Sequence, residues 1–169
     1  MDPQQLISET LETWATERPD LNFEAMGIGL KFDIIATASL GFAGEVIADL
    51  GVNLGEFDVL ATLRRNGKNG VLTPKEIAAA AMVSPSGLTH RLTQLENMGH
   101  IIRQNDPNDR RSSLVRLTPQ GRKIADKGIE RVAQRATQLI NGFSADEVEA
   151  LSTVLDKVLA MISQTITAP

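Results

Sequence analysis

The sequence predicts a mainly α-helical protein with a small β-hairpin wing: a winged helix-turn-helix with dimerisation helices at both ends. Three observations carry this prediction. A short helix and a longer one follow each other in the middle of the chain, a hairpin comes directly after them, and long apolar stripes occupy both ends. The chain has 169 residues, of which 42% are apolar and 22% charged, as in an ordinary globular domain.

The N-terminal part predicts two helices. The first runs from Pro3 to about Thr16 and ends before Pro19, because proline disfavours helix in the residue that precedes it. The second covers the long apolar segment from about Met26 to Leu50, where length favours helix over strand. Glycines weaken the second prediction, since each costs about 1 kcal/mol relative to alanine in a helix.

Three further helices are predicted in the middle of the chain. The first covers Glu56 to Arg65. Thr73-Pro74-Lys75-Glu76 is a capping box with proline at the first helical position, and it opens a short alanine-rich helix from Ile77 to about Met82. Ser84-Pro85 repeats the cap and the proline, and the helix that it opens ends at Gly99.

The hairpin and two long helices complete the predicted fold. Ile101 to Gln104 and Ser113 to Leu117 are strand candidates around a turn rich in Asp, Pro and Asn. Thr118-Pro119 and the capping box at Ser144 open the last two helices, whose apolar stripes predict a dimer interface and core. We therefore divide one compact domain into dimerisation segments 1–53 and 124–169 and a DNA-binding segment 54–123.

Charge is distributed unevenly along the chain. The formal net charge is −4, but Glu56 to Lys123 hold 11 Lys/Arg against 6 Asp/Glu, a net of +5, and the remainder carries −9. A local basic surface attracts polyanions even on an acidic protein. The absence of cysteine excludes disulfides, thiolate metal sites and cysteine catalysis.

Motifs of the common enzyme classes are missing from the sequence. It contains no glycine-rich phosphate loop, no H-E-x-x-H and no serine-elbow motif, so we expect no catalytic residue, metal or cofactor. The start "MDPQQL" does not resemble a signal peptide, and the uncharged stretch from Ile34 to Gly44 is too short to span a bilayer. We expect a cytoplasmic protein that does not enter the membrane.

The helix after Ser84 has the pattern of a recognition helix. Leu88, Leu92, Leu95 and Met98 form an apolar stripe, and the opposite face carries hydrogen-bonding side chains without an acidic residue. A solvated polar face would give the same pattern, but the short preceding helix, the basic hairpin and the local positive charge favour DNA. The residues that we expect to contact DNA from this helix are Ser84, Ser86, Thr89, His90 and Thr93.

The turn of the hairpin carries two adjacent arginines. Arg110 and Arg111 can reach the minor groove beside the recognition helix, where the negative potential favours inserted arginine. Asp109 can accept their hydrogen bonds and hold the shape of the tip. An ordinary charged turn is the alternative interpretation.

The stretch "VLTPKEIAAAAMVSPSGLTHRLTQLENMGHIIRQNDPNDRRSSLVRLTPQGRKI" resembles the MarR family of transcriptional regulators. The resemblance rests on Leu72-Thr73, on Leu88-Thr89 and Leu95-Glu96, and on the wing from Asp106 to Ser112. It implies a homodimer that binds palindromic double-stranded operator DNA, represses a nearby divergent gene and is released by a small aromatic or anionic ligand. A protein-interaction adaptor that keeps the winged helix without binding DNA is the alternative, against which the intact arginine tip argues.

The segments "ETWATERPDLNFEAMGI" and "GEFDVLATLRRNG" resemble the urate-responsive PecS/HucR-like branch. This resemblance implies a ligand site formed by Trp14, Asp58, Arg91 and Arg103, for urate or a similar anion. Arg91 also falls at the edge of the apolar stripe, where a guanidinium is costly unless an anion meets it. A purely structural Asp58–Arg91 ion pair and core packing of Trp14 are the alternatives.

Overall fold

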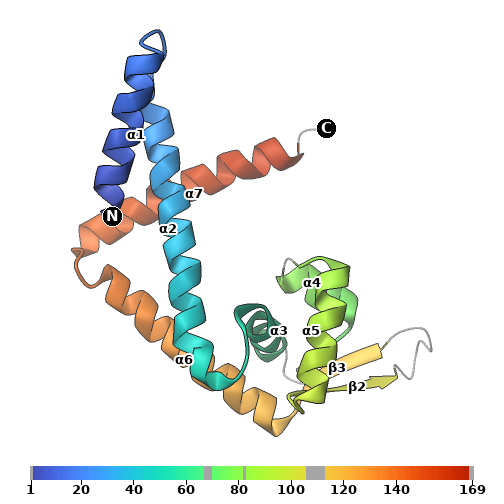
Figure 1. The fold of residues 1–169 in the computed structure, drawn as a ribbon. Coiled ribbons are helices and arrows are strands. Elements are labelled where there is room, and N and C mark those ends of the chain that lie inside the picture. The colour runs from blue at the N-terminus through green and yellow to red at the C-terminus, as the bar shows by residue number, and fades with distance from the viewer. Residues whose placement is uncertain (1, 67–69, 82, 106–112, 168–169) are drawn as a thin grey trace.

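The computed structural model describes residues 2–66, 70–81, 83–105 and 113–167 (Figure 1). It confirms a mainly helical winged helix with a small antiparallel sheet. In chain order the elements are α1 Pro3–Glu17, α2 Glu24–Ile47, the 3-10 turn η1 Ala48–Leu50, α3 Leu54–Arg65, β1 Val71–Leu72, α4 Pro74–Ala81, α5 Pro85–Asn97, β2 Ile101–Asn105, β3 Ser113–Leu117, α6 Pro119–Ile140 and α7 Ala145–Thr167.

Side-chain caps fix where most of these helices begin. Thr73 and Glu76 form the expected box at α4, because the Glu76 carboxylate accepts from the Thr73 amide at 2.7 Å. A further box lies at α3, where Asn53 and Glu56 accept from each other's backbone amides at 2.9 Å. It starts α3 at Leu54, two residues before the predicted start, since asparagine takes the cap position here.

The sheet has three strands where the sequence predicted two. β2 and β3 pair in the expected hairpin, in a register that joins Ile101 to Leu117 and Asn105 to Ser113. β1 pairs with the other edge of β3, giving the order β1-β3-β2. With only two residues, β1 is too short to show alternation in the sequence, and its partner lies far along the chain.

The core is built from α3, α4, α5, the sheet and the start of α6. Its side chains include Leu88, Leu92 and Leu95 from the apolar stripe predicted on α5, together with Phe57, Val59, Leu60 and Leu63 of α3. Gly128 of α6 lies directly on the Phe57 ring, and a Cβ at that position would come 2.1 Å from Phe57 Cε2. This close approach fixes α6 against α3, so α6 shares the core of the winged helix, to which Ile47 of α2 also contributes.

The terminal helices expose much of their apolar surface. α1 packs along α2, and α2 packs against α6 near its other end (Figure 1). Large side chains of α7 remain open to solvent, with Leu159 60% and Met161 68% exposed. Such a broad apolar surface is typical of a protein–protein interface.

Helix α2 and η1 together form a longer apolar stretch than the sequence analysis considered. Glu24–Leu50 is long and apolar enough to cross a membrane by length and composition alone, and only 6% of its most apolar window is buried within the chain. The sequence-based expectation considered the uncharged stretch from Ile34 to Gly44 alone. A membrane-spanning helix can also contain a few charged residues, so the longer segment meets the criterion of length and composition.

Candidate DNA-binding surface and ligand site

Helix α5 is held so that its polar face points outward. Ser84 caps it by accepting a hydrogen bond from the Gly87 amide at 3.3 Å. Leu88, Leu92 and Leu95 anchor the opposite side in the core. The orientation of α5 is therefore set by burial of its apolar stripe, as the helical periodicity predicted.

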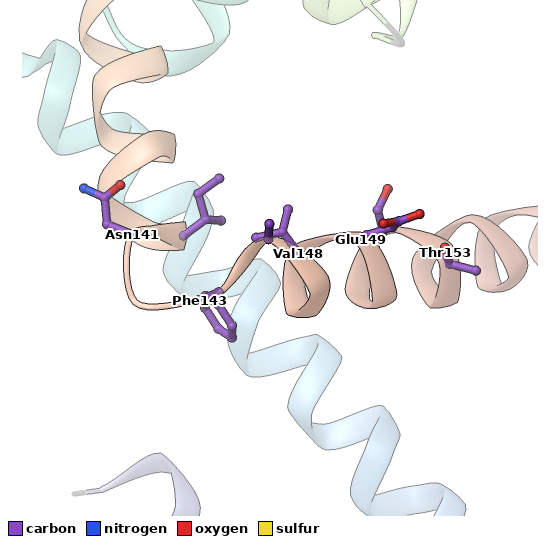
Figure 2. A pocket seen from close by; sticks show the side chains of 8 residues that line it. Asn141, Phe143, Val148, Glu149 and Thr153 are labelled. Atoms are coloured by element: carbon purple, nitrogen blue, oxygen red, sulfur yellow. The ribbon is translucent and has the colours of Figure 1, made fainter.

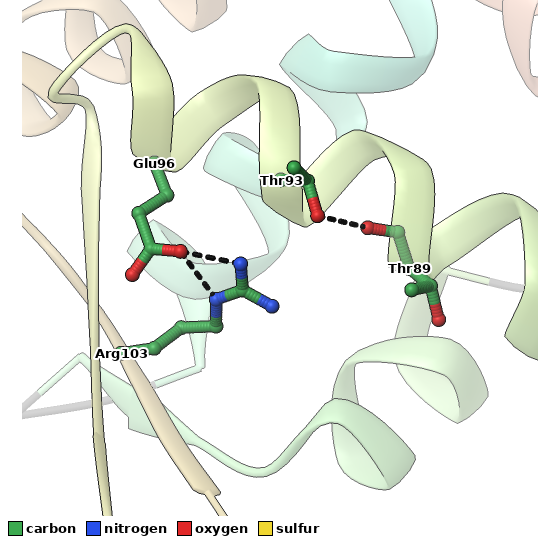
Figure 3. Close-up of polar contacts among 4 residues, drawn as sticks. All are labelled: Thr89, Thr93, Glu96 and Arg103. Carbon is green, nitrogen blue, oxygen red and sulfur yellow. Dashed lines mark hydrogen bonds and ion pairs between the residues drawn. The ribbon is translucent and has the colours of Figure 1, made fainter.

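The five residues of α5 that we expect to contact DNA lie on this outward side. Ser84, Ser86, Thr89, His90 and Thr93 are all exposed. The two serine hydroxyls lie 3.4 Å apart at the start of the helix, and the Thr93 hydroxyl donates to the Thr89 carbonyl at 3.1 Å (Figure 3). Hydroxyl and imidazole groups on an outward helix face suit hydrogen bonding to base edges.

The hairpin that follows α5 forms the wing. Strand β2 begins four residues after the end of α5, with Gly99 in the left-handed region at φ 72° in the connecting turn. The predicted tip residues Asp109, Arg110 and Arg111 lie outside the described residues. Arg116 on β3 is exposed and adds positive charge to the base of the wing.

Glu96 is an acidic residue that the sequence analysis missed beside the recognition face. Its carboxylate accepts from Arg103 Nε at 2.7 Å and also from Nη2 of the same guanidinium (Figure 3). The Arg103 guanidinium lowers the pKa of Glu96 below its usual value. Arg103, expected at the ligand site, thus already has a carboxylate partner within the chain. The seven-residue spacing across Gly99 was the signal that could have revealed the pair.

Arg91 occupies a half-buried position between α5 and α3. Its Nη1 is buried and has no hydrogen-bond partner among the described residues. The guanidinium lies flat against the first turn of α3, where a Cβ on Gly55 would come 2.6 Å from Arg91 Cζ. A buried guanidinium nitrogen without a partner is costly, and an anion that reached it would remove that cost.

Asp58 lies near Arg91 without a direct ion pair. Among the ion pairs that the described residues form, none joins these two side chains. Asp58 is exposed in the single chain, yet neighbouring atoms displace enough water to raise its pKa, against the opposing pull of Arg91 and Arg65. The pair alone therefore does not satisfy Arg91.

Trp14 lies far from these residues within one chain. It stacks on Phe23, with ring centroids 6.2 Å apart and an interplanar angle of 29°. Both rings sit where α1 turns into α2, at the end of α2 that is remote from α3 and α5 (Figure 1). The fold brings Asp58 and Arg91 together but not Trp14.

Hollows lined by apolar side chains occur on the terminal helices. One of about 530 Å³ lies at the turn between α6 and α7, where Phe143 and Val148 face it beside Glu149 (Figure 2). Another runs between α1 and α2, beside Leu11, Gly27 and Ile28. These hollows belong to the exposed apolar surface of the terminal helices and not to the surroundings of Arg91.

Comparison with known proteins identifies the fold. Residues 50–112 match the family model described as the MarR family. The transcriptional regulator PecS of Dickeya dadantii is 32% identical over 155 residues, which cover 90% of this chain and 92% of PecS. The chain belongs to the MarR family.

Other MarR proteins support the same assignment. The multiple antibiotic resistance protein MarR of Salmonella typhimurium is 35% identical over 141 residues, covering 83% of this chain and 96% of that protein. The crystal structure of a mutant Escherichia coli MarR complexed with operator DNA superimposes with a TM-score of 0.69 at 29% identity, over 81% of this chain and 96% of that one. As a MarR-family protein, the chain is a transcriptional regulator and not an enzyme.

Proposed function

We propose that this MarR-family regulator is a homodimeric repressor that binds a palindromic operator and releases it when a small anionic aromatic ligand binds. The observation that carries the proposal is the outward polar face of α5, anchored by buried Leu88, Leu92 and Leu95. Residues 54–123 supply the DNA contacts, from Ser84, Ser86, Thr89, His90 and Thr93 and from the wing tip at 109–111. The likeness to MarR in complex with operator DNA supports this use of the helix.

The dimer follows from the exposed apolar surface of the terminal segments, 1–53 and 124–169. Val154 and Leu159 of α7 and Ile35 and Leu40 of α2 are each more than half exposed in the single chain. A second copy would cover them, and it would also cover α2, whose composition otherwise resembles a membrane span. Two copies of α5 would then lie about one DNA turn apart on a palindrome in the cytoplasm.

The ligand site of the proposal centres on Arg91. Its buried Nη1 offers an unused donor to a carboxylate, urate or a similar anion. Asp58, whose pKa is raised, would be repelled by the ligand's charge or would take up a proton. Arg103 can join only if the ligand displaces Glu96, and Trp14 can join only by a rearrangement or from the second protomer.

Operator binding by the purified protein tests the proposal. We would titrate the protein into labelled DNA from its own upstream region and repeat the titration with millimolar urate, with xanthine and salicylate for comparison. We expect a protein–DNA complex of retarded mobility that dissociates when urate is added. A protein that binds no upstream DNA would instead be the adaptor, and a complex indifferent to every anionic aromatic would leave a regulator without the proposed ligand.

Linkage makes the ligand test reciprocal. If urate weakens operator binding by some factor, operator DNA must weaken urate binding by the same factor. Calorimetric titration of urate into the protein, with and without operator DNA, measures that second factor. Unequal factors would show that urate and operator DNA do not act on the same conformational equilibrium of the dimer.

A further inference from the structure

An ion pair joins the last turn of the recognition helix to the first strand of the wing. The Arg103 guanidinium on β2 holds one oxygen of Glu96 on α5 through both Nε, at 2.7 Å, and Nη2 (Figure 3). The two side chains are about two-thirds covered, with Arg103 31% and Glu96 38% exposed. Seven residues and the Gly99 turn separate the partners, so the contact closes a small loop between the two DNA-facing elements.

The negative charge of Glu96 is electrostatically unfavourable at its position on α5. Glu96 is the penultimate residue of α5, where the helix dipole is negative. It also lies on the same side of α5 as Thr89 and Thr93, so its charge would oppose DNA phosphates (Figure 3). Among the described residues, Arg103 is the cation that pairs with Glu96, so we look for the role of Glu96 in what the pair does for β2.

The base of β2 is fixed to α5 by backbone bonds, since the Gly99 amide donates to the Glu96 carbonyl and the His100 amide to the Leu95 carbonyl, each at 2.9 Å. Beyond this base, Arg103 provides a side-chain link from the middle of β2 to α5.

In the described part of the chain, β2 is an edge strand that pairs with β3 and with no second strand. Ile101 anchors its base in the core, but Ile102 and Gln104 are exposed. Arg103, whose neighbour across the hairpin is the buried Val115, reaches the recognition helix from the middle of the strand.

We propose that Glu96 and Arg103 are positioning residues that set the wing relative to the recognition helix, and that operator recognition requires this acidic residue. The inference rests on the proposed use of α5 and the wing to bind DNA. Without the pair, β2 can pivot about the Gly99 turn, and the wing no longer meets DNA in register with α5.

The substitution Glu96→Gln separates positioning from simple charge. It removes a negative charge from the DNA-facing side and frees a guanidinium, so electrostatics predicts tighter binding to any DNA with a steeper salt dependence. Positioning predicts the opposite for the operator. We expect operator affinity to fall about tenfold, as for loss of a charge-assisted hydrogen-bonded pair, while binding to random DNA is unchanged or tighter.

A matched variant and a charge exchange complete the experiment. Asp126→Asn removes the carboxylate of another partly exposed pair, Arg64–Asp126 at 2.6 Å, which joins α3 to α6 away from the wing. We expect it to leave the ratio of operator to random-DNA affinity unchanged. The double variant Glu96→Arg with Arg103→Glu keeps the pair with its charges exchanged, and should bind the operator more tightly than either of its single variants.

Affinities would be measured by fluorescence anisotropy for operator and random duplexes at several salt concentrations, with circular dichroism verifying folding. Glu96→Gln binding the operator as tightly as the wild type would overturn the inference and leave the regulator function intact. So would an equal loss of specificity in Asp126→Asn, or a charge-exchanged protein that binds the operator no more tightly than the tighter-binding of its two single variants. Wild-type protein that does not distinguish operator from random DNA would instead overturn the proposed function, and this inference with it.

Discussion

Replacing Arg91 by methionine should stabilise the protein and abolish its ligand response. The guanidinium is half-buried against Gly55, and its buried Nη1 finds no hydrogen-bond partner in the part of the chain that the structure describes. Such an unsatisfied donor costs about 1–3 kcal/mol. Methionine keeps the unbranched apolar stem without the polar atoms, and part of the gain is offset by the lost attraction to Asp58.

We therefore expect the free energy of unfolding to rise by about 1 kcal/mol, within the range set by removal of one unpaired donor. For a chain of this length, that gain corresponds to a melting temperature about 2–4 °C higher. Urea unfolding followed by circular dichroism measures the change. Both proteins must be compared at one protomer concentration, because dimerisation contributes to apparent stability.

The comparison variant is Arg103→Met, which removes a guanidinium that does have a partner. Because it leaves Glu96 unpaired, we expect a loss of up to about 1 kcal/mol, as for a partly exposed ion pair. Arg91→Met should still bind the operator but no longer release it with urate. A loss of more than about 1 kcal/mol in Arg91→Met would show that the guanidinium has a partner in solution and would refute the reasoning.

Three other expectations follow from particular residues. Gly121→Ala places a Cβ 2.0 Å from the His100 carbonyl oxygen, so unfolding should become easier by about 1–3 kcal/mol, whereas Gly142→Ala, with no atom within 4 Å, should have little effect in the same urea titration. Burial lowers the pKa of His100, so stability should be complete above about pH 6.5 and should fall as the pH is lowered toward the folded-state pKa. A His100→Gln variant should lose that part of the pH dependence, and an unchanged slope would contradict it. Arg110→Ala and Arg111→Ala should each weaken operator binding and reduce its salt slope by about one, and unaltered slopes would remove the wing tip from the interface.

The sequence by itself determined the order of the helices and placed their boundaries within about three residues, although α2 spans Glu24–Ile47 and not Met26 to Leu50. Capping side chains at Thr73, Ser84, Thr118 and Ser144 mark helix starts, because each cap bonds a backbone amide only three residues away. The apolar stripe of α5 also predicted which side would be buried, since helical periodicity is a local property. The same helical periodicity placed Arg91 at the edge of the apolar stripe, and the structure shows it partly buried there.

Tertiary structure alone decided the contacts between distant segments. β1 exists only because β3 offers its free edge, and the Gly55 surface beneath Arg91 comes from another helix. Arg103 was expected to bind a ligand. The chain reverses direction at Gly99, however, and the Arg103 guanidinium pairs with Glu96. Trp14 stacks on Phe23 at the N-terminal end of α2, away from Asp58 and Arg91. Side chains distant in sequence meet only where packing directs the backbone, and no local pattern records that path.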